Sequence, residues 1–75
     1  MSRKLPQISG KDLIKILLRR GFVLVGQKGS HVKISGIPTI GSNKVTIIVP
    51  YHKTLKLGTL AGILKITKTS ASDLK

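Results

Sequence analysis

Few side chains in this chain of 75 residues can move protons near neutral pH. The chain has no cysteine and no glutamate, and its two acidic residues are Asp12 and Asp73. General acid–base chemistry is therefore left to His31, His52, Tyr51, the serines and the lysines. The absence of cysteine excludes disulfides, zinc fingers and cysteine nucleophiles. Because the acids are few and far apart in the sequence, we expect neither a metal site nor a bound cofactor.

His31 is the strongest candidate for chemistry. It follows Lys28–Ser30, and in a strand its side chain would share one face with Lys33. A neutral histidine can accept a proton, and neighbouring lysines can stabilise negative charge that develops on a phosphate. The glycines at positions 26 and 29 would let a phosphate approach the backbone closely. On the pattern alone, however, an exposed histidine with no catalytic role is the commoner case.

Other signals for a catalytic or nucleotide-binding site are weak. The sequence contains no Walker loop, dinucleotide-binding fingerprint, hydrolase nucleophile elbow or zinc-protease motif. We interpret His52 as a loop histidine whose ring caps or bridges nearby backbone after an expected strand. The aromatic residues are Phe22, which we expect in the core, and Tyr51. Nucleic acid would therefore be bound through charge, backbone groups and shape, because there are too few rings for a stacking platform.

Positive charge dominates the composition. Fourteen lysines and arginines stand against two acids, which gives a formal net charge of +12 at pH 7. Such a charge repels itself in a compact chain, so it indicates a polyanionic partner: nucleic acid first, an acidic protein second, an anionic membrane third. We expect no membrane association, because no apolar run approaches the ~20 residues of a spanning helix and residues 1–7 lack the apolar stretch of a signal peptide. The lack of cysteine fits a cytoplasmic location.

The elements that would position these residues begin with a helix over residues 10–20. Ser9 is a good N-cap, Asp12 would complete a capping box, and Gly21 would end the helix in the left-handed conformation. The apolar stripe of this helix comprises Leu13, Ile14, Leu17 and Leu18. On another face, basic residues follow at i, i+4 and i+8, and they are Lys11, Lys15 and Arg19. We expect this row to contact phosphates, the alternative being an ordinary solvated face.

Sequence typical of a β-sheet follows this helix. The expected strands cover residues 22–25, 30–35 and 44–49, joined by a hairpin turn at 26–29 and a longer turn at 36–43. Alternation in the second strand would turn Val32 and Ile34 toward the core. His31 and Lys33 would then face solvent.

A second helix is expected over residues 57–66, with a further helical turn near 70–74. The apolar stripe of this second helix comprises Leu57, Leu60, Ala61 and Leu64, with Ile63 on its flank. The order of helix, three antiparallel strands and helix predicts an α+β fold of two layers, with both helices on one face of the sheet. We expect residues 1–75 to form one domain.

Several short motifs follow one another in an order typical of one protein family. They are Ser9-Gly10-Lys11-Asp12-Leu13, then Leu17 and Arg20-Gly21-Phe22; Gly29-Ser30-His31; Val49-Pro50-Tyr51-His52; and Leu57-Gly58-Thr59-Leu60 with Ile63-Leu64-Lys65. In this order the chain resembles the HicA (YcfA-like) mRNA-interferase toxins over residues 5–65. Residues 35–44 match no motif of that family.

The resemblance implies a fold like that of double-stranded-RNA-binding domains, which agrees with the element order above. It also implies the toxin of a type II toxin–antitoxin system, a metal-independent endoribonuclease that cuts mRNA. The catalytic histidine of the family falls on His31, and an acidic HicB-like antitoxin would cover this surface. The residues that we expect to bind RNA are Lys11, Lys15, Arg19, Lys28, Gly29, Ser30 and Lys33. The alternatives are a non-catalytic RNA-binding or ribosome-associated module of the same fold, and a basic protein whose partner is an acidic protein.

Overall fold

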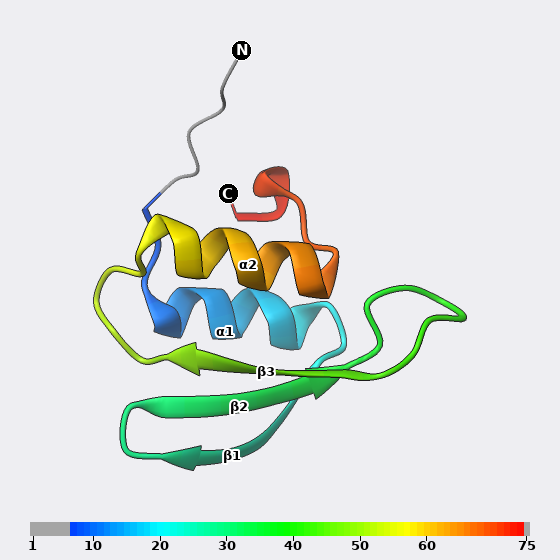
Figure 1. The fold of residues 1–75 in the computed structure, drawn as a ribbon, viewed down its shortest axis with the longest axis horizontal. Coiled ribbons are helices and arrows are strands. Elements are labelled where there is room, and N and C mark those ends of the chain that lie inside the picture. Colours follow the sequence, from blue (N-terminus) through cyan, green and yellow to red (C-terminus); the bar gives the residue numbers. More distant parts are fainter. Residues whose placement is uncertain (1–6, 75) are drawn as a thin grey trace.

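The computed structural model of the protein describes residues 7–74. The elements are α1 (Gly10–Arg19), β1 (Val23–Lys28), β2 (His31–Gly36), β3 (Val45–Pro50), α2 (Leu57–Thr67) and the short 3-10 helix η1 (Ala71–Leu74). The strands form one antiparallel sheet in the order β1-β2-β3, and both helices lie on the same side of it (Figure 1). The predicted α+β fold, helix–three-stranded sheet–helix, is therefore confirmed. None of the helices between residues 7 and 74 has the length and apolar character needed to span a bilayer.

Two expectations concern residues outside this range. Residues 1–6, most of the stretch that is expected not to be a signal peptide, lie outside the described residues, as does Lys75. The resemblance to the toxin family also begins outside them, at residue 5.

Local signals determine both ends of α1. The Ser9 hydroxyl oxygen accepts a hydrogen bond from the Asp12 backbone N–H at 3.0 Å, which confirms the predicted N-cap. The reciprocal bond of a full capping box, in which the Ser9 backbone N–H would donate to the Asp12 carboxylate, is not formed among the described residues. At the other end Gly21 has φ 99°, and the Phe22 N–H donates to the Leu17 carbonyl at 3.0 Å. This is the Schellman arrangement that a glycine after a helix favours.

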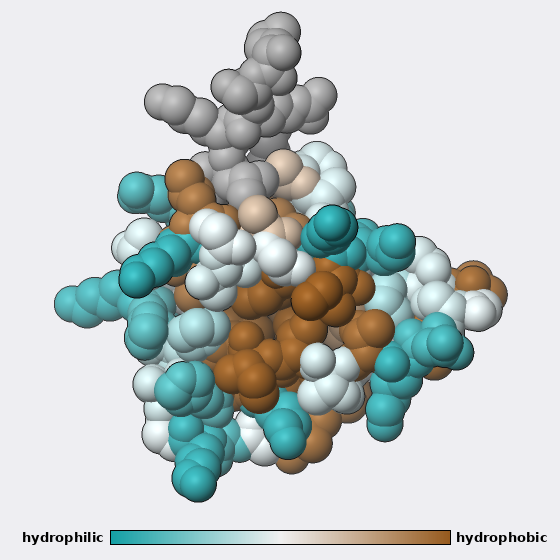
Figure 2. Space-filling model, in the orientation of Figure 1, coloured by the Kyte–Doolittle hydropathy of each residue, from teal (hydrophilic) through white to brown (hydrophobic). Residues whose placement is uncertain are grey.

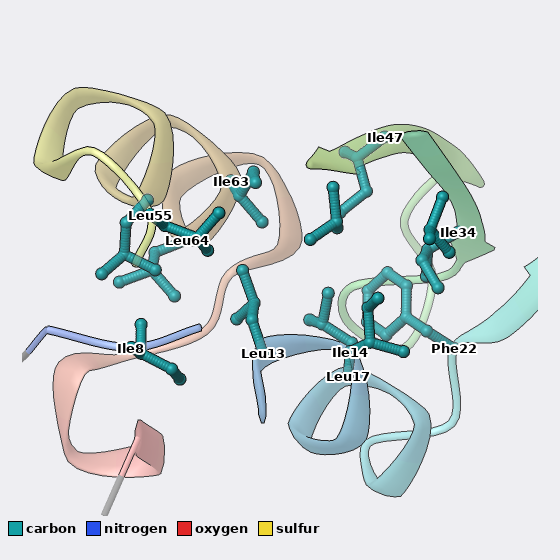
Figure 3. Packing of buried hydrophobic residues seen from close by; sticks show 13 residues of the cluster. Ile8, Leu13, Ile14, Leu17, Phe22, Ile34, Ile47, Leu55, Ile63 and Leu64 are labelled. Carbon is teal, nitrogen blue, oxygen red and sulfur yellow. The ribbon is translucent and has the colours of Figure 1, made fainter. Parts of the chain in front are cut away.

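The core fills the space between the two helices and the inner face of the sheet (Figure 3). Its thirteen buried hydrophobic residues are Ile8, Leu13, Ile14, Leu17, Phe22, Val32, Ile34, Ile47, Val49, Leu55, Leu60, Ile63 and Leu64. The alternation predicted for β2 is confirmed, because Val32 and Ile34 are buried while His31 and Lys33 are exposed. Phe22 is buried, as expected.

The predicted apolar stripes of the helices were partly wrong. Leu18 is 41% exposed and Leu57 is 53% exposed, and Ala61 is also exposed. Helical spacing identifies an apolar face, but the neighbouring elements decide how much of that face is covered. In α2 the covered positions are Leu60, Ile63, Leu64 and Thr67.

Thr67 is a buried polar residue that the apolar pattern could not reveal. Its hydroxyl donates to the Ile63 carbonyl at 2.8 Å and also pairs with the Thr69 hydroxyl at 2.8 Å. The Arg20 guanidinium donates to the Thr67 carbonyl at 2.9 Å and to the Thr69 hydroxyl. Arg20 therefore fastens the end of α1 to the end of α2, so this cation has a structural role.

The hairpin between β1 and β2 differs from the prediction. Its turn consists of Gly29 and Ser30 rather than residues 26–29, and β1 continues to Lys28. The extra length of β1 is accommodated by an irregularity between Leu24 and Gly26, where Val25 has no partner on β2. At the far edge of the sheet, β3 includes Pro50, one residue beyond the predicted end.

The C-terminal segment confirms the helical turn expected near residues 70–74 as η1. Hydrogen bonds from the Ser70 backbone N–H at 2.9 Å and from its hydroxyl at 3.1 Å lower the pKa of the Asp73 carboxyl. Before η1, α2 ends at Lys68, whose φ of 56° is the only left-handed value at a non-glycine residue within residues 7–74. The Thr69 N–H donates to the Leu64 carbonyl at 3.0 Å across this end.

Replacing Lys68 by glycine should stabilise the fold. A side chain in the left-handed region costs about 1–2 kcal/mol, and glycine avoids most of this strain while losing more chain entropy. We expect the free energy of unfolding of Lys68→Gly to rise by about 1 kcal/mol, measured by urea denaturation. Lys65→Gly removes the same charge from a helical position and should instead lose about 1 kcal/mol. A Lys68→Gly variant no more stable than Lys65→Gly would contradict this account.

Candidate functional site

The two-residue turn between β1 and β2 sets the surroundings of His31. Gly29, with φ 59°, occupies the first turn position, where such turns favour glycine. Because the turn holds only Gly29 and Ser30, Lys28 pairs directly with His31 across the hairpin. The turn is braced by a bond from the Gln27 amide to the Gly29 carbonyl at 3.1 Å.

His31 is held from the other side by β3. Its partner there is Pro50, and the Tyr51 N–H donates to the Ser30 carbonyl at 2.6 Å. Residues that pair across antiparallel strands point to the same face of the sheet, with Cβ atoms about 5 Å apart. The Lys28 side chain therefore leaves the sheet beside His31, on the face away from the helices. His31 itself is exposed, and its ring makes no hydrogen bond among residues 7–74.

The irregularity at Val25 decides which residue lies beside Lys33. Val25 is the additional residue of a β-bulge, and beyond it Gly26 pairs with Lys33. On the opposite side of Lys33, its partner in β3 is Ile48. Because Gly26 has no side chain, the surface over it is hollow, and a Cβ built there would meet no atom within 4 Å.

These side chains surround one open depression of about 590 Å³ on the exposed face of the sheet. Its lining residues are Val25, Gly26, Gln27, Lys28, His31, Lys33 and Ile48. The structure thus brings together the predicted catalytic residue and two of the predicted RNA-binding lysines. Gly29 and Ser30 are exposed in the adjoining turn but do not line the depression.

The charge in this depression is entirely basic. Neither of the two carboxylates lines it, since Asp12 lies on α1 and Asp73 on η1. Within residues 7–74, no carboxylate therefore lines the depression beside His31. A proton acceptor flanked by Lys28 and Lys33 is suited to a reaction in which negative charge develops on a phosphate.

Three lining residues were missed from the sequence. The sequence pattern places Gln27 in the turn and predicts Val25 and Ile48 only as strand residues. Their places depend on which residues pair across strands, which a single sequence does not specify. The clearest available signal was the glycine at 26 inside a run of β-forming residues, since a glycine there often marks a bulge.

The basic row of α1 is separate from this depression. Lys11, Lys15 and Arg19 are all exposed, as predicted. Lys15 and Arg19, however, line a second and smaller depression of about 250 Å³ together with Asp12 and Leu74. Figure 2 shows hydrophilic side chains spread around the rim of the molecule, with an apolar area at the centre of the view. High net charge therefore does not by itself locate the site.

The second histidine, His52, does not line the depression around His31. Its backbone carbonyl accepts a hydrogen bond from the Gly10 N–H at 2.9 Å, which joins the start of α1 to the end of β3. A side chain at position 10 would overlap the Pro50 carbonyl, so this approach requires glycine. The expected capping by the His52 ring is not found among residues 7–74.

Possible metal ligands do not gather in this part of the chain. Within residues 7–74, no three histidine or acidic side chains are placed to hold a metal ion.

Comparison with known protein families relates most of the chain to one of them. Residues 10–68 match the family model described as the HicA toxin of bacterial toxin–antitoxin systems. No curated protein and no solved structure matches the chain. The matched residues include α1, the whole sheet and α2, and hence every residue of the depression.

Proposed function

Because the chain belongs to the HicA toxin family of bacterial toxin–antitoxin systems, we propose that it is an endoribonuclease that cuts mRNA with His31 as general base. Membership of this family implies an antitoxin as a partner. The observation that carries the proposal is the depression in which His31 is exposed beside Lys28 and Lys33.

The proposed reaction is an attack within the RNA chain. Neutral His31 accepts the proton of a ribose 2′-hydroxyl, and the 2′-oxygen forms a bond to the adjacent phosphorus. The bond from phosphorus to the 5′-oxygen of the next nucleotide then breaks, leaving a 2′,3′-cyclic phosphate and a 5′-hydroxyl. The departing oxygen takes its proton from Lys28, Lys33 or water. DNA is inert in this reaction, because it lacks the 2′-hydroxyl.

The two lysines would supply electrostatic stabilisation. Lys28 lies directly across the hairpin from His31, and Lys33 lies two residues along the same strand, about 7 Å away. Both can reach a phosphate that is placed over His31. Their charge is most useful on the extra negative charge of the pentacovalent transition state. No step of this reaction uses a metal ion.

Binding of the RNA backbone and binding of the antitoxin would compete for this face. The net charge of +12 attracts RNA, and it would equally attract an acidic HicB-like antitoxin. An antitoxin that covers the depression would exclude RNA from His31. This accounts for inhibition without any change in the fold of the toxin.

The catalytic role of His31 can be tested by in vitro cleavage of RNA in the presence of EDTA. His31→Ala should lower the cleavage rate by about 10²–10⁴-fold, because a general base contributes a factor of that size. Binding and thermal stability should change little, since the side chain is exposed and makes no hydrogen bond. His52→Ala is the matched control and should cleave at the normal rate. Undiminished cleavage by His31→Ala would refute the assignment, and loss of activity in EDTA would refute metal independence.

Phosphate contacts can be located from the salt dependence of binding, measured with an uncleavable 2′-O-methyl RNA. For single strands, each phosphate that the protein neutralises contributes about 0.7 to the logarithmic slope. Lys28→Ala and Lys33→Ala should each lower the slope by about this amount. Lys15→Ala should do the same if the α1 row also tracks the backbone. An unchanged slope for Lys15→Ala would show that this row is only solvated.

A further inference from the structure

The proposed cleavage uses only some of the side chains that line the depression. His31, Lys28 and Lys33 perform the reaction, whereas Val25 and Ile48 take no part in it. These two apolar side chains are 56% and 45% exposed, although both belong to the sheet. Exposure of apolar surface to water is unfavourable. Apolar walls in an otherwise cationic depression therefore point to a ligand that is itself part apolar and part anionic.

The strand register places these two apolar side chains on either side of Gly26, which has no side chain. Gly26 and Ile48 are the two partners of Lys33, one in β1 and the other in β3. Val25 precedes Gly26 and lines the same depression because the bulge interrupts the alternation of β1. The hollow over Gly26 is thus bounded by Val25 on one strand and by Ile48 two strands away. Its volume of about 590 Å³ lies within the range of small-molecule sites.

This hollow lies at a useful distance from the reacting groups. His31 and Lys33 are two residues apart on β2, so the hollow is displaced by about 7 Å from His31 along the strand. A planar base over Gly26 would bring its own ribose and phosphate toward His31 and Lys28. A nucleotide combines the apolar faces of its base with an anionic phosphate. The depression combines apolar walls, which suit the base, with lysines, which suit the phosphate.

We infer that the end of the depression formed by Val25, Gly26 and Ile48 binds one unpaired nucleobase beside the cleaved bond, so that the substrate class is single-stranded RNA. This inference rests on the proposed function for the identity of the ligand. A base within a duplex is stacked and paired, so it could enter the hollow only after being flipped out, which is unfavourable. Single-stranded RNA presents its bases without that cost.

The test measures binding rather than cleavage. The probes are a single-stranded 2′-O-methyl RNA of eight nucleotides, an abasic strand with the same number of phosphates, and the duplex of the first strand. None of them has a free 2′-hydroxyl, so the unmodified protein can be used throughout. We expect the base-bearing strand to bind about tenfold more tightly than the abasic strand, a ratio that corresponds to 1.4 kcal/mol at 25 °C. It should also bind more tightly than the duplex.

Gly26→Leu should abolish this preference by filling the hollow. No atom lies within 4 Å of an added Cβ at this position, so the fold should accept the side chain. Binding of the abasic strand should stay the same. Gly62→Leu, on α2, is the matched control because its added Cβ also meets no atom within 4 Å, and it should keep the full preference. Ile48→Ala removes one wall without adding bulk and should reduce the preference severalfold.

Three results would overturn the inference: equal binding of base-bearing and abasic strands, equal binding of the single strand and the duplex, or a full preference in Gly26→Leu. The first is also what is expected if the apolar walls serve a protein partner instead. Failure of the proposed function would be seen separately, as normal cleavage by His31→Ala. The binding ratios do not depend on that result.

Discussion

The site depends on the two-residue turn of the hairpin between β1 and β2. With only Gly29 and Ser30 between the strands, Lys28 must lie opposite His31. A turn one residue longer or shorter would change the partner of His31 and turn a different side chain of β1 to the exposed face. The bond from Tyr51 to the Ser30 carbonyl holds this turn against the end of β3. The backbone geometry thereby places a cation next to the candidate base.

The bulge at Val25 follows from the same constraint. The turn determines the pairing at one end of β1, and the α1 terminus with buried Phe22 determines it at the other, where Val23 pairs with Ser35. Between these ends β1 has one residue more than β2, so the additional residue must bulge. The result is a glycine opposite Lys33 and an apolar side chain beside it. Both proposals use this feature. In the proposed cleavage Lys33 stabilises charge on the phosphate, and in the further inference the nucleobase binds in the hollow over Gly26.

The remainder of the chain keeps the exposed face of the sheet open. Both helices cover the inner face, where the core holds thirteen hydrophobic residues, and Arg20 ties their ends together through Thr67 and Thr69. Because both helices lie on one side, no helix within residues 7–74 covers the outer face of the sheet (Figure 1). A small domain has little interior in which to enclose a substrate. An open depression on a sheet is accordingly the kind of site that it can offer.

What the sequence determined by itself was local. Ser9 and Gly21 marked the ends of α1, because a cap and a left-handed residue act within one helical turn, and alternation in β2 correctly separated Val32 and Ile34 from His31 and Lys33. The prediction of a catalytic role for His31 depends largely on family resemblance. The tertiary structure decided the rest: the turn at Gly29 and Ser30, the exposure of Leu18 and Leu57, and the separation of Lys15 and Arg19 from the depression. Strand register and the burial of each helix face depend on residues that are distant in the sequence. A local sequence pattern therefore cannot predict them.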